Sequence, residues 1–234
     1  MRILSVNVAR PCTAADRSLP GGSFTAGLAS GIDKRPVAGP VAVAAPGPQG
    51  EAGSGLAGDA VVSLKHHGGD DQAVYAFARE DLDRWERELG RALPDGSFGE
   101  NLTTLGLDVN GARIGERWLV GDRLLLEVTS PRVPCRTFAD WLGERGWVRR
   151  FTEEAAPGAY LRVLASGEVR AGDPVTVVHR PDHEVSVAFA FRARTTEQAL
   201  LPRVLAAGDG LHPRLRERAE RYAEAARTAD GVPA

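Results

Sequence analysis

The stretch GDRLLLEVTSPRVPC at residues 121–135 carries the pattern that decides the fold. Its Gly-Asp pair supplies a turn, and the leucine-rich run at 123–128 suits a pleated strand. Pro131 and Pro134 then end the strand, because proline cannot donate to a strand ladder. Two further Gly-Asp pairs stand directly before apolar runs, Gly58-Asp59 before residues 60–64 and Gly172-Asp173 before residues 175–178. Short strands begun by such turns favour an antiparallel barrel over a parallel α/β sheet.

The same pattern extends over most of the first 180 residues. Apolar runs predict further strands at residues 3–9, 41–45, 117–120 and 160–164. The chain has 27 glycines and 15 prolines among 234 residues, a content that implies many turns. We therefore expect a mainly β fold, a β-barrel with a few covering helices.

Helical spacing predicts one clear helix, because Ala78, Leu82, Trp85 and Leu89 recur at intervals of four, three and four. Gly90 is a suitable stop, and Asp83 precedes Arg87 by four residues on the outer face. Shorter helical pieces are expected at residues 138–142 and 147–155, where they would cover one end of the barrel.

The pattern changes after Pro181. Thr195 and Gln198 form a capping box before an apolar run, and the stripe from Leu215 to Ala226 is amphipathic. For residues 185–191 a strand and a short helix beginning after Ser186 both stay open. We expect a small α-helical C-terminal appendage over residues 181–228, followed by a frayed tail at residues 229–234.

Charge and hydropathy exclude several classes of partner. The 29 Lys and Arg residues against 31 Asp and Glu residues give a net charge of −2, and they are dispersed along the chain. No nucleic-acid footprint is visible, and no apolar stretch approaches the roughly 18 residues of a membrane span. The N-terminus lacks a secretory pattern, so we expect a cytoplasmic protein with small-molecule partners.

Glycine-rich segments at residues 14–30 and 47–58 are long enough to be functional loops. Gly53, Gly55 and Gly58 match the dinucleotide-binding spacing G-x-G-x-x-G. We reject that match, because a strand is expected after them and a dinucleotide fold needs its glycines to open a helix.

Cys135 is the strongest single candidate for chemistry. Two cysteines are too few for a disulfide scaffold, so each counts as a free thiol. The prolines before Cys135 make its loop stiff, and the cationic Arg132 and Arg136 favour the thiolate, which attacks electrophiles and binds soft metals. The alternative is a buried, inert cysteine. Cys12 is assigned no role.

The segment from Lys65 through His66 and His67 to Gly68 and Gly69 indicates an anion cradle. Glycines between a strand and a helix expose backbone N–H groups, and the lysine and imidazoles add donors. Paired histidines are otherwise often structural, and this spacing is not that of a zinc site.

Two further segments carry polar groups. Lys34 lies in a second basic turn and could equally be a solvated surface lysine. Glu100 and Asn101 could contact the edge of a heterocycle, or simply cap their own loop.

Six blocks taken together resemble the MOSC domain family, and within it the stand-alone bacterial YiiM-type branch, over residues 2–226. The blocks are Gly31-Ile32-x-Lys34, Gly55-Leu56-x-Gly58-Asp59, His67-Gly68-Gly69, Ala73-Val74-Tyr75, Phe98-Gly99-Glu100-Asn101-Leu102 and Pro131-Arg132-x-Pro134-Cys135. The resemblance implies a MOSC β-barrel domain over residues 1–180 and a three-helix extension over 181–228.

The resemblance also implies a function. Family members bind the molybdenum cofactor, a pterin with a phosphate tail and a dithiolene-bound metal, and reduce N-hydroxylated compounds such as 6-N-hydroxylaminopurine. By that resemblance Cys135 is a molybdenum ligand or a persulfide carrier, and His67 and Asn101 deliver protons. The residues expected to hold the cofactor are Lys34, Lys65, His67, Gly68, Gly69, Asn101, Arg132 and Cys135. An unidentified electron donor is required, and homodimer formation stays open.

The sequence departs from the family pattern at two positions. Ser63 stands where the family usually has an acid, and Gln72 stands where a lysine is common. Phosphate binding would then fall more on Lys34, Lys65, Arg132 and backbone amides. Two alternatives to an enzyme are a non-catalytic carrier of cofactor or sulfur, and an unliganded barrel whose helical tail docks a partner or a second copy.

Overall fold

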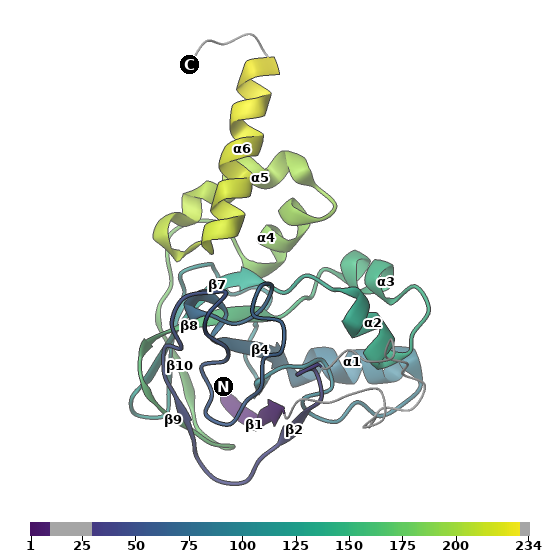
Figure 1. The fold of residues 1–234 in the computed structure, drawn as a ribbon, viewed down its shortest axis with the longest axis vertical. Coiled ribbons are helices and arrows are strands. Elements are labelled where there is room, and N and C mark those ends of the chain that lie inside the picture. Colours follow the sequence, from purple (N-terminus) through teal and green to yellow (C-terminus); the bar gives the residue numbers. More distant parts are fainter. Residues whose placement is uncertain (10–29, 230–234) are drawn as a thin grey trace.

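The computed structural model of the chain describes residues 1–9 and 30–229 (Figure 1). Most of the predicted glycine-rich loop at 14–30, together with Cys12 and the tail after residue 229, lies outside these residues. Within the described residues no helix has the length and apolar character needed to cross a membrane.

The described fold is built on one eight-stranded sheet and a separate two-stranded sheet. The large sheet runs in the order β10 (Val175–His179), β6 (Arg117–Val120), β7 (Leu124–Pro131), β8 (Ala159–Ala165), β4 (Val74–Ala78), β5 (Leu102–Leu105), β1 (Arg2–Ala9) and β2 (Lys34–Pro36). The small sheet pairs β3 (Val41–Val43) with β9 (Gly167–Val169). The predicted strands at 3–9, 41–45, 117–120, 123–128, 160–164 and 175–178 are thus confirmed.

The sheet curls without closing into a barrel. Strands β10 and β2 stand at its two ends, so the strand ladder is not continuous. The start of β1 nevertheless meets the turn before β10: Ile3 N donates to Asp173 O at 2.9 Å, and Gly172 N donates to Ile3 O at 2.8 Å. The expectation of a sheet-rich fold is confirmed, but the ring of strands is completed by backbone hydrogen bonds and not by a full ladder.

One crossover departs from the antiparallel pattern. Strands β4 and β5 pair in parallel, with Ala76 opposite Leu102, and helix α1 (Arg79–Leu89) connects them. The predicted helix is confirmed, and Gly90 ends it with φ 65°. Its predicted Asp83–Arg87 pair is wrong, because Asp83 binds Arg79 at 2.6 Å instead.

A cluster of aromatic side chains forms a second core beside the sheet. Helices α2 (Arg136–Leu142) and α3 (Trp147–Glu154) cover α1 on one flank of the sheet (Figure 1). Trp85 of α1 lies 4.6 Å from Trp147, and Phe98 lies 5.1 Å from Phe138, measured between ring centroids. This packing holds the loop that carries Phe98 against the helix that follows Cys135.

The predicted strand at residues 60–64 is wrong. Ala60 N donates to Ala9 O at 2.9 Å, and the chain then turns, since Ser63 O accepts from His66 N and His67 N. Local β propensity is overridden because the side chain of the preceding residue, Asp59, is held in a buried polar cluster described below.

The C-terminal segment consists of helices. The open choice at 185–191 is decided in favour of helix α4 (Val187–Arg194), whose Ser186 Oγ accepts from Phe189 N at 3.1 Å. The capping box predicted from Thr195 is wrong, because Thr195 ends α4 by donating from Oγ1 to Phe191 O at 2.7 Å.

After α4 come helices α5 (Leu201–Val204) and α6 (Pro213–Ala229), together with the 3-10 turns Gln198–Leu200 and Leu205–Gly210. Leu215 and Ala219 bury one side of α6, and the far end of the helix projects away from the sheet (Figure 1).

The aromatic core yields a stability prediction. Phe151 is 1% exposed among Trp and Phe rings, whereas Val148 on the same helix is 41% exposed. We expect Phe151→Ala to lower the free energy of unfolding by about 3–5 kcal/mol, because it leaves a cavity. Val148→Ala should change it by less than about 0.5 kcal/mol. Urea unfolding followed by fluorescence measures both, and equal losses would contradict the assignment of Phe151 to the core.

Candidate functional site

A cavity opens between the starts of β2, β4 and β8, the end of β7 and the turn at residues 59–63. The space between its lining residues, together with its solvent-open mouth, is about 1120 Å³. Six of the eight predicted cofactor-binding residues line it: Lys34, His67, Gly68, Asn101, Arg132 and Cys135. The cavity therefore brings together predicted residues from four separate segments of the chain.

Two predicted residues do not line the cavity. Lys65 is exposed, and its carbonyl oxygen accepts from Arg214 Nη2 at 3.0 Å. Gly69 is buried, and its N–H donates to Gly53 O at 2.9 Å. The expectation that these two residues contact a ligand in this cavity has no support in the geometry, because their neighbours are other parts of the loop and helix α6.

The carboxylate of Asp59 organises one wall of the cavity. Lys34 Nζ donates to both of its oxygens, at 2.5 and 2.6 Å, and Ala9 N donates to Oδ1 at 2.8 Å. Asn101 Nδ2 donates to Oδ2 at 2.8 Å. The side chain of Asp59 is 1% exposed and that of Lys34 is 8% exposed. A residue that the sequence presented as a turn former is thus a buried partner of three distant segments.

This cluster changes the roles expected for Lys34 and Asn101. Burial lowers the pKa of Lys34, against the opposing effect of Asp59, and the ammonium that lines the cavity is already paired with a carboxylate. The Asn101 amide is also engaged, since Oδ1 accepts from Tyr75 N at 3.1 Å while Nδ2 binds Asp59. Asn101 is therefore a positioning residue, and the proton-delivery role predicted for it finds no free donor.

Glu100 caps its own loop, which is the structural alternative given for this segment in the sequence analysis. It is buried, and its carboxylate accepts from Gly96 N at 2.6 Å and Phe98 N at 3.0 Å. Burial raises the pKa of Glu100, and these backbone donors oppose that effect. The side chain caps its own loop and does not line the cavity.

Arg132 lines the cavity and forms no ion pair with a carboxylate of the described residues. It is 7% exposed, and its guanidinium lies 4.0 Å from the ring centroid of Phe138 and 5.1 Å from that of Tyr75. One N–H donates to Phe98 O. No Asp or Glu of the described chain lies within 4.0 Å of its guanidinium. By contrast, Arg79 pairs with Asp95, and Arg117 pairs with Glu127. A buried charge without a counter-ion is costly, so this position favours an anion in the cavity.

Cys135 and two tyrosines complete the same wall. Cys135 is a free, half-buried thiol directly before α2 and three residues after Arg132. Burial raises the pKa of Tyr75 and of Tyr160, so both phenols stay protonated at neutral pH. Tyr75 donates its proton to Pro157 O at 2.8 Å. Tyr160 also lines the cavity, and its hydroxyl has no hydrogen bond among the described residues. No sequence motif identified Tyr160 as a site residue.

His67 also lines the cavity, and its imidazole is uncharged at pH 7. Although much of the residue is exposed, its pKa is lowered to about 4, first by removal of the imidazole from solvent and then by Arg132, His66 and Lys34. It is neutral at pH 7 and contributes an N–H and an acceptor, not a positive charge. Gly68 beside it has φ 80°, and a Cβ there would lie 2.6 Å from Gly53 O, so glycine is required.

Gln72 adds an unpaired acceptor. Its Oε1 is buried without a hydrogen-bond partner in the described structure, and the residue lines the cavity. A buried acceptor left unpaired costs about 1–3 kcal/mol, so a ligand N–H is favoured here. Ser63, the other departure from the family pattern, also lines the cavity.

Comparison with known proteins shows which family and which relatives this chain is similar to. Residues 63–176 match the MOSC domain family. The uncharacterized protein YflK of Bacillus subtilis is 36% identical over 135 residues, which cover 58% of this chain and 61% of YflK. A protein named reductase from Gibberella moniliformis is 30% identical over 155 residues, 63% of this chain and 27% of that protein. The chain thus spans less than two thirds of these curated relatives.

A solved structure matches over a greater length. The crystal structure of YiiM from Geobacillus stearothermophilus has a TM-score of 0.72 and 28% sequence identity to this chain. The match covers 94% of this chain and 97% of the Geobacillus protein, so the C-terminal helices fall within the shared fold.

Removal of the Asp59 carboxylate tests the polar cluster. We expect Asp59→Asn to lower the free energy of unfolding by roughly 3–5 kcal/mol, because Lys34 would be left as a buried charge without its partner. Asp122→Asn is the matched control, since Asp122 occupies another Gly-Asp turn and is exposed, and it should change stability by less than about 0.5 kcal/mol. Similar effects of the two substitutions in urea unfolding would show that the Asp59 cluster is not stabilising.

The state of His67 is open to direct titration. Its ordinary pKa of 6.5 is lowered to about 4 in the folded protein, so the unfolded chain takes up a proton that the folded chain resists. This contribution to stability is present above pH 6.5 and is lost as the pH falls through 4. NMR titration of the ring C–H signals, with His67→Gln to assign the resonance, should place the midpoint near 4. A midpoint near 6.5 would contradict this environment.

Proposed function

For this chain, which carries a MOSC domain and shares the fold of YiiM, we propose the function of a molybdenum-cofactor-dependent reductase of N-hydroxylated bases or amines. The observation that carries the proposal is the pairing of a free thiol, Cys135, with the buried and uncompensated guanidinium of Arg132 on one cavity wall. The relative from Gibberella moniliformis that is named a reductase supports the reaction class.

The residues present fit the cofactor on chemical grounds. A thiolate is a soft ligand suited to the metal, and Cys135 is the free thiol of the described chain. Arg132 offers positive charge to an anionic pterin dithiolene, and the orphaned Gln72 Oε1 can accept from a pterin N–H. Gly68 is required by the fold of this wall, because a Cβ there would collide with the backbone of Gly53. Lys34, being paired with Asp59, contributes less charge than a free lysine would.

The overall reaction sets what the side chains must do. Reduction of R–NHOH to R–NH₂ and water consumes two electrons and two protons, so a reductant and a proton source are both needed. When bound, the molybdenum cofactor supplies the two-electron chemistry at the N–O bond. The electrons come from an external electron donor.

Tyr160 is the residue best placed to hold a proton for the leaving oxygen. Its phenol is protonated at neutral pH and lines the cavity beside Cys135 and Arg132. His67 is neutral at pH 7, so it can pass on a proton through its ring but does not store one as an imidazolium. Asn101 positions Asp59 and the backbone of Tyr75 and thereby keeps the wall in shape.

Metal analysis tests the ligand role. The protein is purified from a host that makes the cofactor, as wild type, Cys135→Ala and Cys12→Ala. We expect Cys135→Ala to hold at least about tenfold less molybdenum, because loss of a ligand weakens metal binding more than loss of an outer partner. Cys12→Ala, which removes the other thiol, should match the wild type. Equal molybdenum in all three would exclude Cys135 as ligand.

A carrier of cofactor or sulfur would give a different result from the same preparations. It would show a persulfide on Cys135 by mass spectrometry and no reduction of 6-N-hydroxylaminopurine with an artificial electron donor. Reduction of that compound by wild-type protein, lost in Cys135→Ala, is the result that the proposed reductase requires.

A further inference from the structure

The cavity has a solvent-open end, and the exposed residues of its lining lie there. Val62 is 43% exposed, and the side chain of Arg136 is 89% exposed. At the inner end of the cavity, Asn101 and Arg132 are buried. The proposed function assigns no role to the residues of the open end, so their chemistry is free to act on another part of the ligand.

Helix α2 forms one side of this open end. One face of the helix is buried in the aromatic core through Phe138, Trp141 and Leu142. Arg136, Thr137 and Asp140 line the cavity, and their spacing of three and four residues places them together on another face of the helix. Helical side chains tilt towards the helix N-terminus, so Asp140 leans back towards the turn that begins after Cys135.

Asp140 brings a carboxylate with unused hydrogen-bonding capacity to the open end. The other carboxylate in the described lining, that of Asp59, is already held by its hydrogen-bond partners. Asp140 is 28% exposed and, within the described chain, accepts no hydrogen bond at its carboxylate. It pairs with the exposed Arg136 at 3.9 Å, and an exposed pair of that length contributes little. Asp140 can therefore accept from an N–H or O–H of a ligand.

Val61 and Val62, here called the apolar lip, form another part of the open end. Both belong to the turn at residues 59–63, and Val62 is exposed to solvent. Gly31 lets this turn pack closely, because a Cβ at Gly31 would collide with Ala60 O. An exposed apolar side chain at the rim of a cavity favours contact with an apolar ligand surface, since that contact removes both surfaces from water. A flat ring would satisfy the apolar lip and leave its edge for a polar partner.

We propose that the open end of the cavity recognises a heteroaromatic base, whose ring contacts the apolar lip and whose far edge donates a hydrogen bond to Asp140. This inference rests on the proposed function, which directs the N–O group of the base towards Cys135. Five residues separate Cys135 from Asp140, a rise of about 7.5 Å along a helix, which a bicyclic base can span. Asp140 is thus a specificity-determining residue and takes no part in cleavage of the N–O bond.

The donor on the base has two chemical sources. A free base offers a ring N–H, and a nucleoside offers ribose hydroxyls at the same edge; a carboxylate accepts from both. Adenine, adenosine and 9-methyladenine separate these sources, because 9-methyladenine keeps the ring and lacks both donors.

Calorimetry with these three compounds tests recognition without turnover. It uses the protein as purified from a host that makes the cofactor, with no electron donor. We expect the wild type to bind adenine or adenosine about tenfold more tightly than 9-methyladenine, because a hydrogen bond to a carboxylate contributes about that factor. Asp140→Ala should abolish this preference, and Asp140→Asn, which keeps a neutral acceptor, should retain part of it. A wild type that binds the three compounds equally, or a preference that survives in Asp140→Ala, overturns the role of Asp140.

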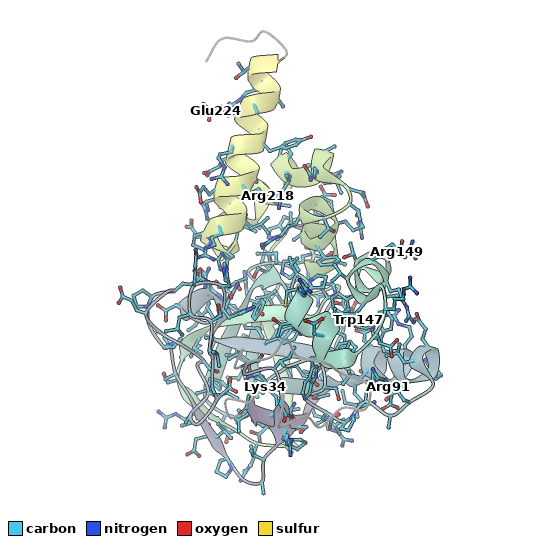
Figure 2. The ribbon with its side chains drawn as sticks, turned by 45° about the vertical axis from the view of Figure 1, so that its right-hand side comes forward. Lys34, Arg91, Trp147, Arg149, Arg218 and Glu224 are labelled. Carbon is cyan, nitrogen blue, oxygen red and sulfur yellow. The ribbon has the colours of Figure 1, made fainter. Side chains whose placement is uncertain are left out.

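Glu153→Gln is the matched control. Glu153 pairs with Arg149 at 3.8 Å with the same spacing of four residues, but it lies on α3, outside the described lining of the cavity. Figure 2 shows Arg149 at the surface of the molecule. Glu153→Gln should bind all three compounds like the wild type. A loss equal to that in Asp140→Ala would reveal a general effect of charge and overturn the proposal.

Val62→Ser tests the apolar lip separately. It should weaken binding of all three compounds by a similar factor and keep the preference for a donor, because Asp140 is unchanged. Unchanged affinity for all three compounds would exclude contact between the ring and the lip.

Turnover gives a readout that separates this inference from the proposed function. With 6-N-hydroxylaminopurine and an artificial electron donor, Asp140→Ala should raise KM by about the factor by which it lowers the affinity for the preferred ligand. A lower kcat at unchanged KM would contradict a recognition role. Where the wild type reduces nothing, the proposed function fails, while the calorimetry still decides whether Asp140 recognises the base.

Discussion

The buried carboxylate of Asp59 is the interaction on which the cavity depends. It joins the end of β1 through Ala9, the start of β2 through Lys34 and the approach to β5 through Asn101. These three segments are far apart in sequence, and a buried charge is stable only when its hydrogen-bonding capacity is filled. Because all of its partners must be in place together, this one side chain determines how the strands that border the cavity meet.

The cavity contains two buried cations in different electrostatic states. Lys34 is neutralised by Asp59, whereas Arg132 contacts aromatic rings and a carbonyl oxygen but no carboxylate of the described chain. Negative charge in a ligand is therefore drawn towards Arg132, the side on which Cys135 lies. The same asymmetry places a thiol, a guanidinium and the Tyr160 phenol together on one wall, which is the arrangement that the proposed reductase uses.

The C-terminal helices contact both the sheet and the loop at the edge of the cavity. The family match ends at residue 176, yet the likeness to the Geobacillus structure covers 94% of the chain. Arg214 of α6 binds the carbonyl of Lys65 in the loop that carries His67, and His212 binds β7. These contacts tie the helices to both the loop and the sheet at the edge of the cavity.

The sequence by itself determined the elements whose signal is local. The strands at 117–120 and 175–178, the helix with Trp85 and the stiff loop of Cys135 follow from turn residues, apolar spacing and proline, all within a few neighbouring residues. The sequence motifs also identified six of the residues that line the cavity. Tertiary structure alone decided the features that depend on partners distant in sequence. These are the parallel pairing of β4 with β5 and the irregular path of residues 60–64. They also include the hydrogen bonds of Lys34 and Asn101 to Asp59, and the position of Lys65 outside the cavity. A carboxylate after glycine forms an exposed turn at Asp122 and a buried ion pair at Asp59, and the difference is set by which charges the fold brings within reach.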